Sequence, residues 1–345
     1  MQCVPRGHSS GDPADPPHVS ARLVADPVPT MDTLRDLVAL AVYAPSSHNT
    51  QPWRFRLAPA SIDLLADRTR ALPVNDPFDR ELVISCGAAL MALRVAAAAK
   101  GLAADVRLLP DPADHDVLAR VVVGRGAVEP GLADLAAHLL ARRTYRKAFD
   151  PHAVPEETMA ALGAAAALEG GDLRVLDGDE RKVAGELVAE GDHHLWNDPR
   201  WRRELAMWMH PRRDGDGLAV PALVAPVAQA VVRTFDMGDG LAAKDQQLLL
   251  GSPSLTVLAT EEDDPRAWLH AGQALQRALL EGCRRGLQAS YLNQPIEVPA
   301  LRQRLREALG TPGYPQVLLR WGHPAGPVAP TPRRPVDAVI DVAEA

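Results

Sequence analysis

The sequence contains the same pattern of elements twice, and this repeat restricts the folds open to the chain more than any other feature. The segment GAALMALRVAAAAKGL begins at Gly87, and GQALQRALLEGCRRGL begins at Gly272, 185 residues later. Self-similarity at a fixed offset is typical of a structural unit that occurs more than once. Aligned without gaps, the two segments are identical at Gly87/Gly272, Ala89/Ala274, Leu90/Leu275, Gly101/Gly286 and Leu102/Leu287.

The segments around these two predicted helices also correspond. One alanine-rich helix can match another by chance, but the same order of helix, strand, helix and strand in both halves makes chance a poor explanation. We therefore expect a duplicated α+β unit whose two halves pack together. The further pairs are SIDLLA (61–66) with SLTVLA (254–259), RVVVG (120–124) with LLRWG (318–322), and TLRDLVALA (33–41) with TMAALGAAA (158–166).

Hydrophobic periodicity and breaker residues predict the individual elements. The first helix, 32–43, has Thr33 as a candidate cap, and the helix over 81–100 is so apolar that it should be buried on most sides. Trp201 and Trp208 lie seven residues apart on one helical face, which favours core packing over a ligand-covering role. The other predicted elements are strands at 53–57, 61–66, 117–123, 254–259 and 316–321, and helices at 132–142, from 155, at 179–210, 266–286 and 299–309.

Charge and cysteine content exclude several classes of protein. The 345 residues carry a net charge of −7, which argues against a generally basic face that binds nucleic acid. The three cysteines are far apart and form no C-x-x-C pair, so we expect neither a disulfide framework nor a metal site. No apolar run approaches the roughly 20 residues of a membrane span. Residues 1–30 are rich in proline and lack the apolar region of a secretory signal, which predicts a disordered tail on a cytoplasmic protein.

Two polar segments are candidates for binding chemistry. The first, APSSHNTQPW (44–53), is dense in hydroxyl and amide groups that can hydrogen-bond the edge of a flat heteroaromatic ligand, or satisfy a helix-terminating turn. The second, RRTYRKAF (142–149), places four cations within six residues. Arginines beside a hydroxyl form a forked donor set suited to a phosphate or a polarised carbonyl, although a solvated basic helix end has the same composition.

Together the two segments resemble motifs of the nitroreductase family of FMN-dependent flavoproteins. The family pattern contains R-R-S-x-R-x-F, V-P-x-E and A-P-S-x-x-N-x-Q-P-W, to which RRTYRKAF, VPEE (154–157) and APSSHNTQPW are similar. The likeness extends loosely over residues 31–340. It implies an α+β, nitroreductase-like fold, a bound FMN, NAD(P)H as the possible electron donor, and a small-molecule acceptor as the partner.

The resemblance also implies which residues bind FMN. Arg142 and Arg146 would hold the phosphate and the pyrimidine edge, and Thr144 stands where the family usually has serine. Either Arg333 or Arg334 would act as a C-terminal phosphate clamp, and backbone groups around 290–292 would approach flavin N5. The full set of candidate residues is Ser46, Ser47, His48, Asn49, Gln51, Arg142, Arg143, Thr144, Arg146, Ser290, Tyr291, Leu292, Arg333 and Arg334.

The motifs occur in the reverse of the family order. PSSHNTQPW comes first and RRTYR about 95 residues later, and the second half has LEGGDLRV (168–175) where the polar loop would be. This arrangement resembles the tandem, Acg-like branch of the family. We therefore expect two trimmed half-copies that form an intramolecular pseudo-dimer with one FMN site in a monomeric chain. The expected units are the tail at 1–30, a first half at 31–128, and a second half at 129–345 with an inserted helical lid at about 185–250.

The resemblance predicts an FMN-dependent oxidoreductase. NAD(P)H would transfer a hydride to flavin N5 and leave, and a nitroaromatic, a quinone or a similar flat acceptor would then be reduced in the same place, with no catalytic side chain. One alternative is a non-catalytic protein that stores FMN under a lid and excludes NAD(P)H. Another is a degenerate structural or regulatory protein without a cofactor. The sequence leaves open the acceptor and the choice between NADH and NADPH.

Overall fold

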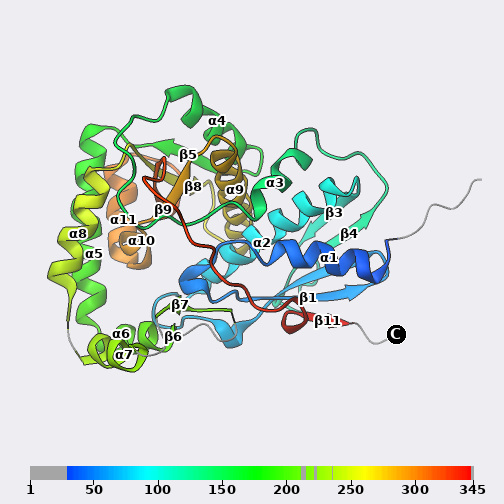
Figure 1. The fold of residues 1–345 in the computed structure, drawn as a ribbon, viewed down its shortest axis with the longest axis horizontal. Coiled ribbons are helices and arrows are strands. Elements are labelled where there is room, and N and C mark those ends of the chain that lie inside the picture. The colour runs from blue at the N-terminus through cyan, green and yellow to red at the C-terminus, as the bar shows by residue number, and fades with distance from the viewer. Residues whose placement is uncertain (1–28, 211–214, 221–223, 235, 343–345) are drawn as a thin grey trace, which may run out of the picture.

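The computed structural model describes residues 29–210, 215–220, 224–234 and 236–342. Two β-sheets lie on either side of a central pair of long helices, α2 and α9, which pack against each other (Figure 1). The predicted tail at 1–30 falls almost entirely outside the described residues. The first half consists of α1 (Met31–Ala41), β1 (Trp53–Ala58), β2 (Ser61–Ala66), α2 (Arg80–Ala99), β3 (Ala103–Leu108) and β4 (Val117–Gly124).

The second half has the same elements in the same order. The strands of the first sheet run β1-β2-β4-β3 and those of the second β5-β8-β10-β9, with every neighbouring pair in these two series antiparallel. This equivalence confirms the predicted α+β fold built from two related halves. The second half consists of α4 (Glu156–Ala167), β5 (Asp172–Val175), β8 (Ser254–Thr260), α9 (Pro265–Arg284), β9 (Gln288–Tyr291) and β10 (Tyr314–Gly322).

The two repeat-related glycines meet where α2 crosses α9. A Cβ atom on Gly87 would lie 2.4 Å from the Leu269 carbonyl oxygen, and one on Gly272 would lie 2.0 Å from the Ile84 carbonyl oxygen. Ile84 and Leu269 are themselves related by the 185-residue offset, so the contact is reciprocal. Reciprocal contacts of this kind define the two-fold interface of a symmetric dimer. The chain therefore contains within itself an interface with the geometry of a pseudo-dimer.

Helix α2 is the most deeply buried helix of the first half, as its composition predicts. Its side chains from Leu82 to Leu93 are buried without interruption. Within the described part of the chain, α2 is long and apolar enough to cross a membrane, contrary to the expectation that no such run exists, yet 89% of this stretch is buried inside the protein. The hydrophobicity of α2 thus serves the contact with α9 and the first sheet.

The two halves differ in one connection, which in the second half is a long helical insertion. Between β1 and β2 the first half has only the turn at Pro59 and Ala60, whereas β5 and β8 are separated by residues 176–253. Asp177 begins the insertion with a capping box, in which its side chain and that of Glu180 bond each other's backbone N–H groups. The insertion consists of α5 (Gly178–Asn197), α6 (Pro199–Met207), β6 (Met209–His210), β7 (Leu218–Ala219), α7 (Ala225–Thr234) and α8 (Gly238–Leu250).

The C-terminal segment returns to the first half. Strand β11 (Ile340–Val342) pairs in parallel with β1 at the edge of the first sheet, so that Ile340 lies opposite Phe55. Figure 1 shows this segment, in red, crossing from the second half to β1. Residues 340–342 therefore extend the sheet of the first half, and they tie the two halves together.

Several local expectations differ from the structure. Thr30, not Thr33, caps α1, because its hydroxyl accepts the Thr33 N–H. The helix expected at 132–142 is reduced to a short 3-10 turn and α3 (Ala136–Leu139). Strands β3 and β5 were not predicted, because each lies at a sheet edge where apolar and polar residues mix. The remaining helices are α10 (Gln294–Glu297) and α11 (Pro299–Ala308).

Candidate functional site

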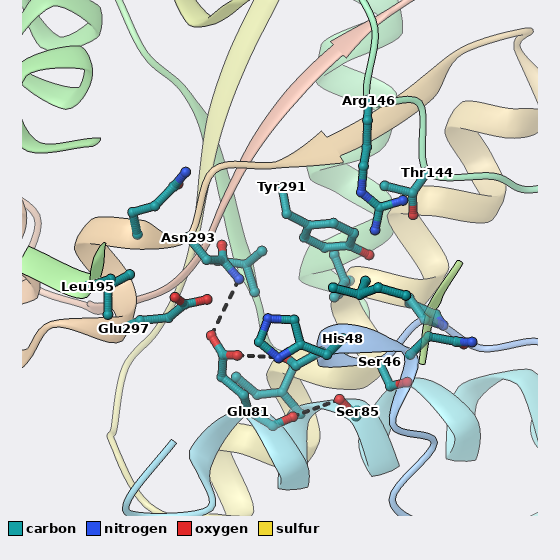
Figure 2. A pocket seen from close by; sticks show the side chains of 18 of the residues that line it. Ser46, His48, Glu81, Ser85, Thr144, Arg146, Leu195, Tyr291, Asn293 and Glu297 are labelled. Carbon is teal, nitrogen blue, oxygen red and sulfur yellow. Dashed lines mark hydrogen bonds between the residues drawn. The ribbon is translucent and has the colours of Figure 1, made fainter. Parts of the chain in front are cut away.

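A cavity of about 330 Å³ lies where the two halves and the insertion meet (Figure 2). Its volume falls within the roughly 300–1,000 Å³ that is typical of ligand pockets. We call it the main pocket. Its polar lining comes from the loop after α1 (Ser46, Ser47, His48, Asn49), from α2 (Glu81, Ser85), from the segment before α4 (Arg142, Thr144, Arg146), from β9 and α10 (Tyr291, Asn293, Gln294, Glu297), from the insertion (Asp192, Asp245) and from Thr331 and Arg333.

The loop after α1 has an unusual backbone. His48, Asn49 and Gln51 all have positive φ angles, of 48°, 54° and 52°. Residues other than glycine rarely adopt this conformation, and several together persist only where the surroundings enforce it. The Ser46 hydroxyl contributes by accepting the Gln51 N–H at 3.0 Å. The tight loop brings Ser46, Ser47 and His48 to the pocket wall.

The two amide side chains of this loop hold other parts of the chain. The Asn49 amide donates to the Gly217 carbonyl at 3.3 Å, and the Gln51 amide donates to the Gly215 carbonyl at 3.0 Å. Gln51 is fully buried and also accepts the backbone N–H of Arg334 at 3.0 Å. Asn49 still lines the pocket, whereas Gln51 lies behind it and joins the insertion to the C-terminal segment.

The arginine-rich segment places its side chains on different sides. Arg142, Thr144 and Arg146 line the main pocket. Arg143 does not, because its backbone N–H donates to Gln288 Oε1 at 2.7 Å and its guanidinium bonds the Leu140 and Arg142 carbonyls. The segment is held against the second sheet by the Tyr145 N–H, which donates to the Ala289 carbonyl at 2.9 Å.

Several buried polar atoms at the pocket have no hydrogen-bond partner among the described residues. They are Arg142 Nε and Nη1, His48 Nδ1 and the Tyr291 hydroxyl. Only 5% of Arg142 is exposed, and burial lowers the pKa of its guanidinium. Burial, with a contribution from Arg146, lowers the pKa of His48 to about 4, so His48 is neutral at pH 7. A buried cation with unused donors favours an anionic, hydrogen-bonding ligand.

The expected contacts around 290–292 are only partly available. Tyr291 lines the pocket, but Ser290 and Leu292 do not. The Leu292 N–H donates to the Leu318 carbonyl at 3.0 Å, and Ser290 is paired with Arg320 between β9 and β10. These backbone groups hold the sheet, so the side chain of Tyr291 is the part of this strand that faces the pocket.

The two candidate C-terminal arginines differ in their position relative to the main pocket. Arg333 lines the pocket and its guanidinium donates to the carbonyls of Val42 at 2.8 Å and Tyr43 at 3.1 Å, which secures the end of α1. Arg334 lies outside the lining and donates to the Gln51 carbonyl at 3.1 Å. Arg333 is therefore the one of the two that can also reach a ligand.

The pocket contains polar residues that motif analysis missed. Glu81 accepts the Ser47 hydroxyl at 2.6 Å and the Asn293 amide at 3.5 Å. Figure 2 shows Glu81, Glu297 and Asn293 grouped on one side of the pocket and Arg146 and Thr144 on the other. A signal for Glu81 exists in the sequence, since it and Ser85 are polar residues four apart in a mostly apolar helix. Asn293 and Glu297 carry no such signal.

The insertion contributes an apolar wall. Leu195, Trp196, Trp201 and Leu241 line the pocket. Trp201 is 7% exposed, its indole donates to Asn75 Oδ1 at 2.7 Å, and its ring packs edge-on against Trp196. It is thus a core residue, as expected, and a wall of the pocket as well. Among the residues that the structure describes, no cluster of His, Cys, Asp or Glu side chains is suited to hold a metal ion.

Comparisons with known proteins show which family the chain resembles. The family model described as "Nitroreductase family" matches residues 20–76. A Mycobacterium tuberculosis (strain ATCC 25618 / H37Rv) protein named "Putative NAD(P)H nitroreductase Rv3131" is 38% identical over 324 residues, which cover 91% of this chain and 92% of the relative. A second protein of that strain, "Putative NAD(P)H nitroreductase acg", is 29% identical over 324 residues, with coverage of 92% and 98%.

Among solved structures, the FMN-dependent nitroreductase NfnB from Mycobacterium smegmatis, crystallised in complex with NADPH, matches with 18% identity and a TM-score of 0.42. The match covers 62% of this chain and 100% of that one. The family follows from the curated relatives, because an identity of 38% extends over nearly the whole length of both chains. On this ground the chain belongs to the nitroreductase family.

Proposed function

We propose that the main pocket binds one FMN and that the protein uses NAD(P)H to reduce flat acceptors such as nitroaromatics and quinones. The observation that carries the proposal is Arg142, a buried cation with two unused nitrogen donors at the pocket wall. Arg146 lies beside it, and among the described residues no carboxylate pairs with either side chain. A phosphate supplies the negative charge and the acceptor atoms that these two guanidiniums lack.

The donor set fits the rest of FMN as well. Arg142 and Arg146 would hold its anionic groups, and the hydroxyls of Ser46, Thr144 and Tyr291 are placed along the same wall for its polar chain and ring edge. When bound, FMN supplies hydride-transfer chemistry, and the protein supplies position and electrostatics. Cationic donors near the pyrimidine edge favour the more negative, reduced form of the cofactor.

A difference between the two halves supports a single cofactor site in each chain. The equivalent of the loop after α1 is the short segment after α4, and it brings Glu169 to Arg94 and Arg277 instead of opening a polar wall. Glu169 and Arg277 are both buried, so these charges are already paired. We infer that only the junction with the polar loop retains a cofactor site, and that the monomer is the working unit.

The spectrum of the purified protein tests this function. We expect a yellow protein whose flavin band bleaches on anaerobic addition of NADH or NADPH and returns on addition of a quinone or a nitroaromatic. A preparation that stays colourless after incubation with FMN would contradict the proposal. Light scattering provides a separate check, because a monomer of 37.0 kDa is expected.

Arginine variants test the placement of the cofactor. Replacing Arg146 with alanine should weaken FMN binding roughly 10- to 100-fold, because a charge-assisted hydrogen bond contributes about 1.5–3 kcal/mol. Arg143→Ala is the matched control, since Arg143 is in the same segment but lies outside the pocket lining. Equal retention of FMN by both variants, measured by ultrafiltration, would remove the basis for the assignment.

The insertion favours a second candidate, a protein that stores FMN without turnover. Trp196, Trp201 and Leu241 close one side of the pocket, and the bonds from Asn49 and Gln51 to residues 215–217 hold the insertion to the opposite half. An insertion held in this way would restrict access of NAD(P)H to the cofactor. A flavin band that dithionite bleaches but NADH and NADPH do not would select storage over reduction.

A further inference from the structure

A second cavity of about 390 Å³ lies behind the main pocket. It reaches the surface at Phe78, whose side chain is 72% exposed. The partly buried Glu297 lines both cavities, so its carboxyl group stands in the wall between them. Neither family resemblance nor motif analysis assigns a role to this wall.

Carboxyl groups outnumber cations in this wall. Asp76 and Arg80 line the second cavity, Glu81 lines the main pocket, and Glu297 lines both. Arg80 Nη2 contacts Glu81 Oε1 at 3.2 Å, and the neighbouring Arg302, which donates to the same Gln316 Oε1 as Arg80, is paired with Asp263 at 2.8 Å. With Arg302 committed to Asp263, one cation remains for three carboxylates, and this imbalance favours a proton on the cluster.

The pKa shifts of two carboxyl groups in the wall agree with this charge count. Burial raises the pKa of Glu297 well above its usual range, and the adjacent Glu81 raises it further. Burial, again with a contribution from Glu81, raises the pKa of Asp76 to about 6. Several elements packed around Glu297 contribute titratable or charged groups. They are Glu81 and Arg80 on α2, Asp76 before α2, Arg302 on α11 with its partner Asp263, and Asp192 and Asp245 of the insertion.

Hydrogen bonds connect the cluster to the ligand side. Ser47 donates its hydroxyl to Glu81 Oε2 at 2.6 Å, and Asn293 donates to Glu81 Oε1. Figure 2 shows the carboxyl groups of Glu297 and Glu81 close together on the pocket wall, although they come from α10 and α2. A proton on Glu297 is therefore in the wall of the main pocket and also within reach of the second cavity.

We propose that Glu297, beside Glu81, carries protons from the second cavity into the main pocket and donates them to the acceptor that is reduced there. This role rests on the proposed reductase function and adds a catalytic residue to it. The two halves and the insertion line the main pocket, and Glu297 gives it a proton route from a second, separate cavity.

The chemistry balances with one proton per turnover. Reduction of a quinone to a hydroquinone consumes two electrons and two protons, and NAD(P)H supplies both electrons and one proton as a hydride. The second proton leaves the Glu297 carboxyl as its O–H bond breaks, and a new O–H bond forms on the quinone oxygen. The Glu297 carboxylate then takes a proton from solvent in the second cavity.

Infrared spectroscopy tests the protonation state without turnover. The full-length protein at neutral pH should show the carbonyl stretch of a buried, protonated carboxylic acid, shifted by ¹³C-labelled glutamate. Glu297→Gln should lose this band, and the exposed Glu262→Gln should keep it. A wild-type spectrum without the band, or a band that survives in Glu297→Gln, would overturn the proposal.

A single-turnover experiment tests the transfer itself. The FMN-loaded protein is reduced with dithionite and mixed anaerobically with benzoquinone, so that the result does not depend on NAD(P)H. Glu297→Gln should slow reoxidation roughly 100-fold and remove its solvent isotope effect, and Glu297→Asp should restore part of the rate. The wild-type rate should fall as pH rises through the pKa of Glu297, whereas the Glu297→Gln rate should stay flat.

Two outcomes separate this role from the proposed function. Equal rates and equal pH profiles for wild type and Glu297→Gln would overturn the proton-donor role while leaving the reductase intact. A wild-type protein that binds no FMN, or whose reduced form does not react with benzoquinone, would overturn the reductase and with it the donation to an acceptor.

Discussion

The two halves of the molecule share a framework and differ in two connections. Both have the same order of strands around one buried helix, and the helices meet at repeat-related glycines. The first half has an eleven-residue polar loop at 42–52 and a tight turn between its first strands, whereas the second has a short segment at 168–171 and a long insertion at 176–253. Duplication preserved the framework, and the connections diverged to build one pocket between unlike partners.

The clearest consequence concerns the segment at 168–171. Where the first half presents hydroxyl groups to a pocket, this segment presents Glu169 to two arginines. The same position after the first helix of each half thus serves binding in one half and charge pairing in the other. Four variants can break or sharpen this contrast.

The largest effect is expected at Glu169. Glu169→Ala would leave Arg94 and Arg277 with only the more exposed Glu129 as a carboxylate partner. Removal of one member of a buried ion pair costs up to roughly 3–5 kcal/mol of unfolding free energy. Urea denaturation measures the loss. Glu307→Ala, an exposed glutamate on α11, is the control. Equal stability of the two variants would show that the paired charges do not substitute structurally for a polar loop.

The glycine contact between the halves should be nearly as sensitive. Gly272→Ala places a Cβ atom 2.0 Å from the Ile84 carbonyl oxygen, so α2 and α9 must separate, at a cost of roughly 1–3 kcal/mol. Gly240→Ala, in an exposed position of α8 with open space around it, should instead stabilise the protein by about 0.5–1 kcal/mol. Thermal unfolding distinguishes the two signs, and a stabilised Gly272→Ala protein would contradict the close crossing.

The insertion should make stability depend on pH. Burial and the neighbouring Asp245 raise the pKa of Asp192 to about 7, whereas the unfolded value is near 3.8. The folded state therefore binds the proton more tightly, and stability should fall as pH rises from about 4 through 7. The melting temperature should drop between about pH 4 and 7, less steeply in Asp192→Asn and unchanged in slope in Glu186→Gln, a control on the exposed face of α5. Identical slopes in all three proteins would exclude a buried, titrating Asp192.

The smallest effect is expected at the contact between the polar loop and the insertion. Asn49→Ala removes a hydrogen bond to the Gly217 carbonyl, which should cost about 1 kcal/mol. Protection of the Gly217 amide, which donates to the Asn49 carbonyl at 3.1 Å, should fall in hydrogen exchange. Unchanged protection would indicate that the insertion is held by other contacts.

Local patterns predicted the framework because they depend on short-range physics. The apolar stripe of α1 at Leu34, Leu37, Val38 and Ala41 is buried as its spacing indicates, and α2 is enclosed as its composition requires. Edge strands β3 and β5 were missed, because a strand exposed on one side shows no strong apolar pattern. The end of α1 was correct within two residues, but its cap was not, since Thr30 and Thr33 are equally good caps by residue type.

The candidate site was predictable where function lies in a contiguous motif. Loop residues Ser46, Ser47, His48 and Asn49 and the arm residues Arg142, Thr144 and Arg146 all line the main pocket. A motif does not state which side a residue faces, so Gln51, Arg143 and Arg334 were grouped with neighbours from which the backbone turns them away. Their binding roles stay predictions, and their positions argue for structural ones.

By itself the sequence determined that the chain is a duplicated α+β unit with one intact polar loop and one intact arginine arm, because repeats and motifs are written in consecutive residues. Tertiary structure alone decided that the loop and the arm meet, that the C-terminal strand joins the first sheet, and that Glu81 and Glu297 share one wall. These contacts join residues separated by about a hundred to two hundred positions or more. Only the packing of α2 against α9 brings them together, and that packing depends on complementary surfaces rather than on any local pattern.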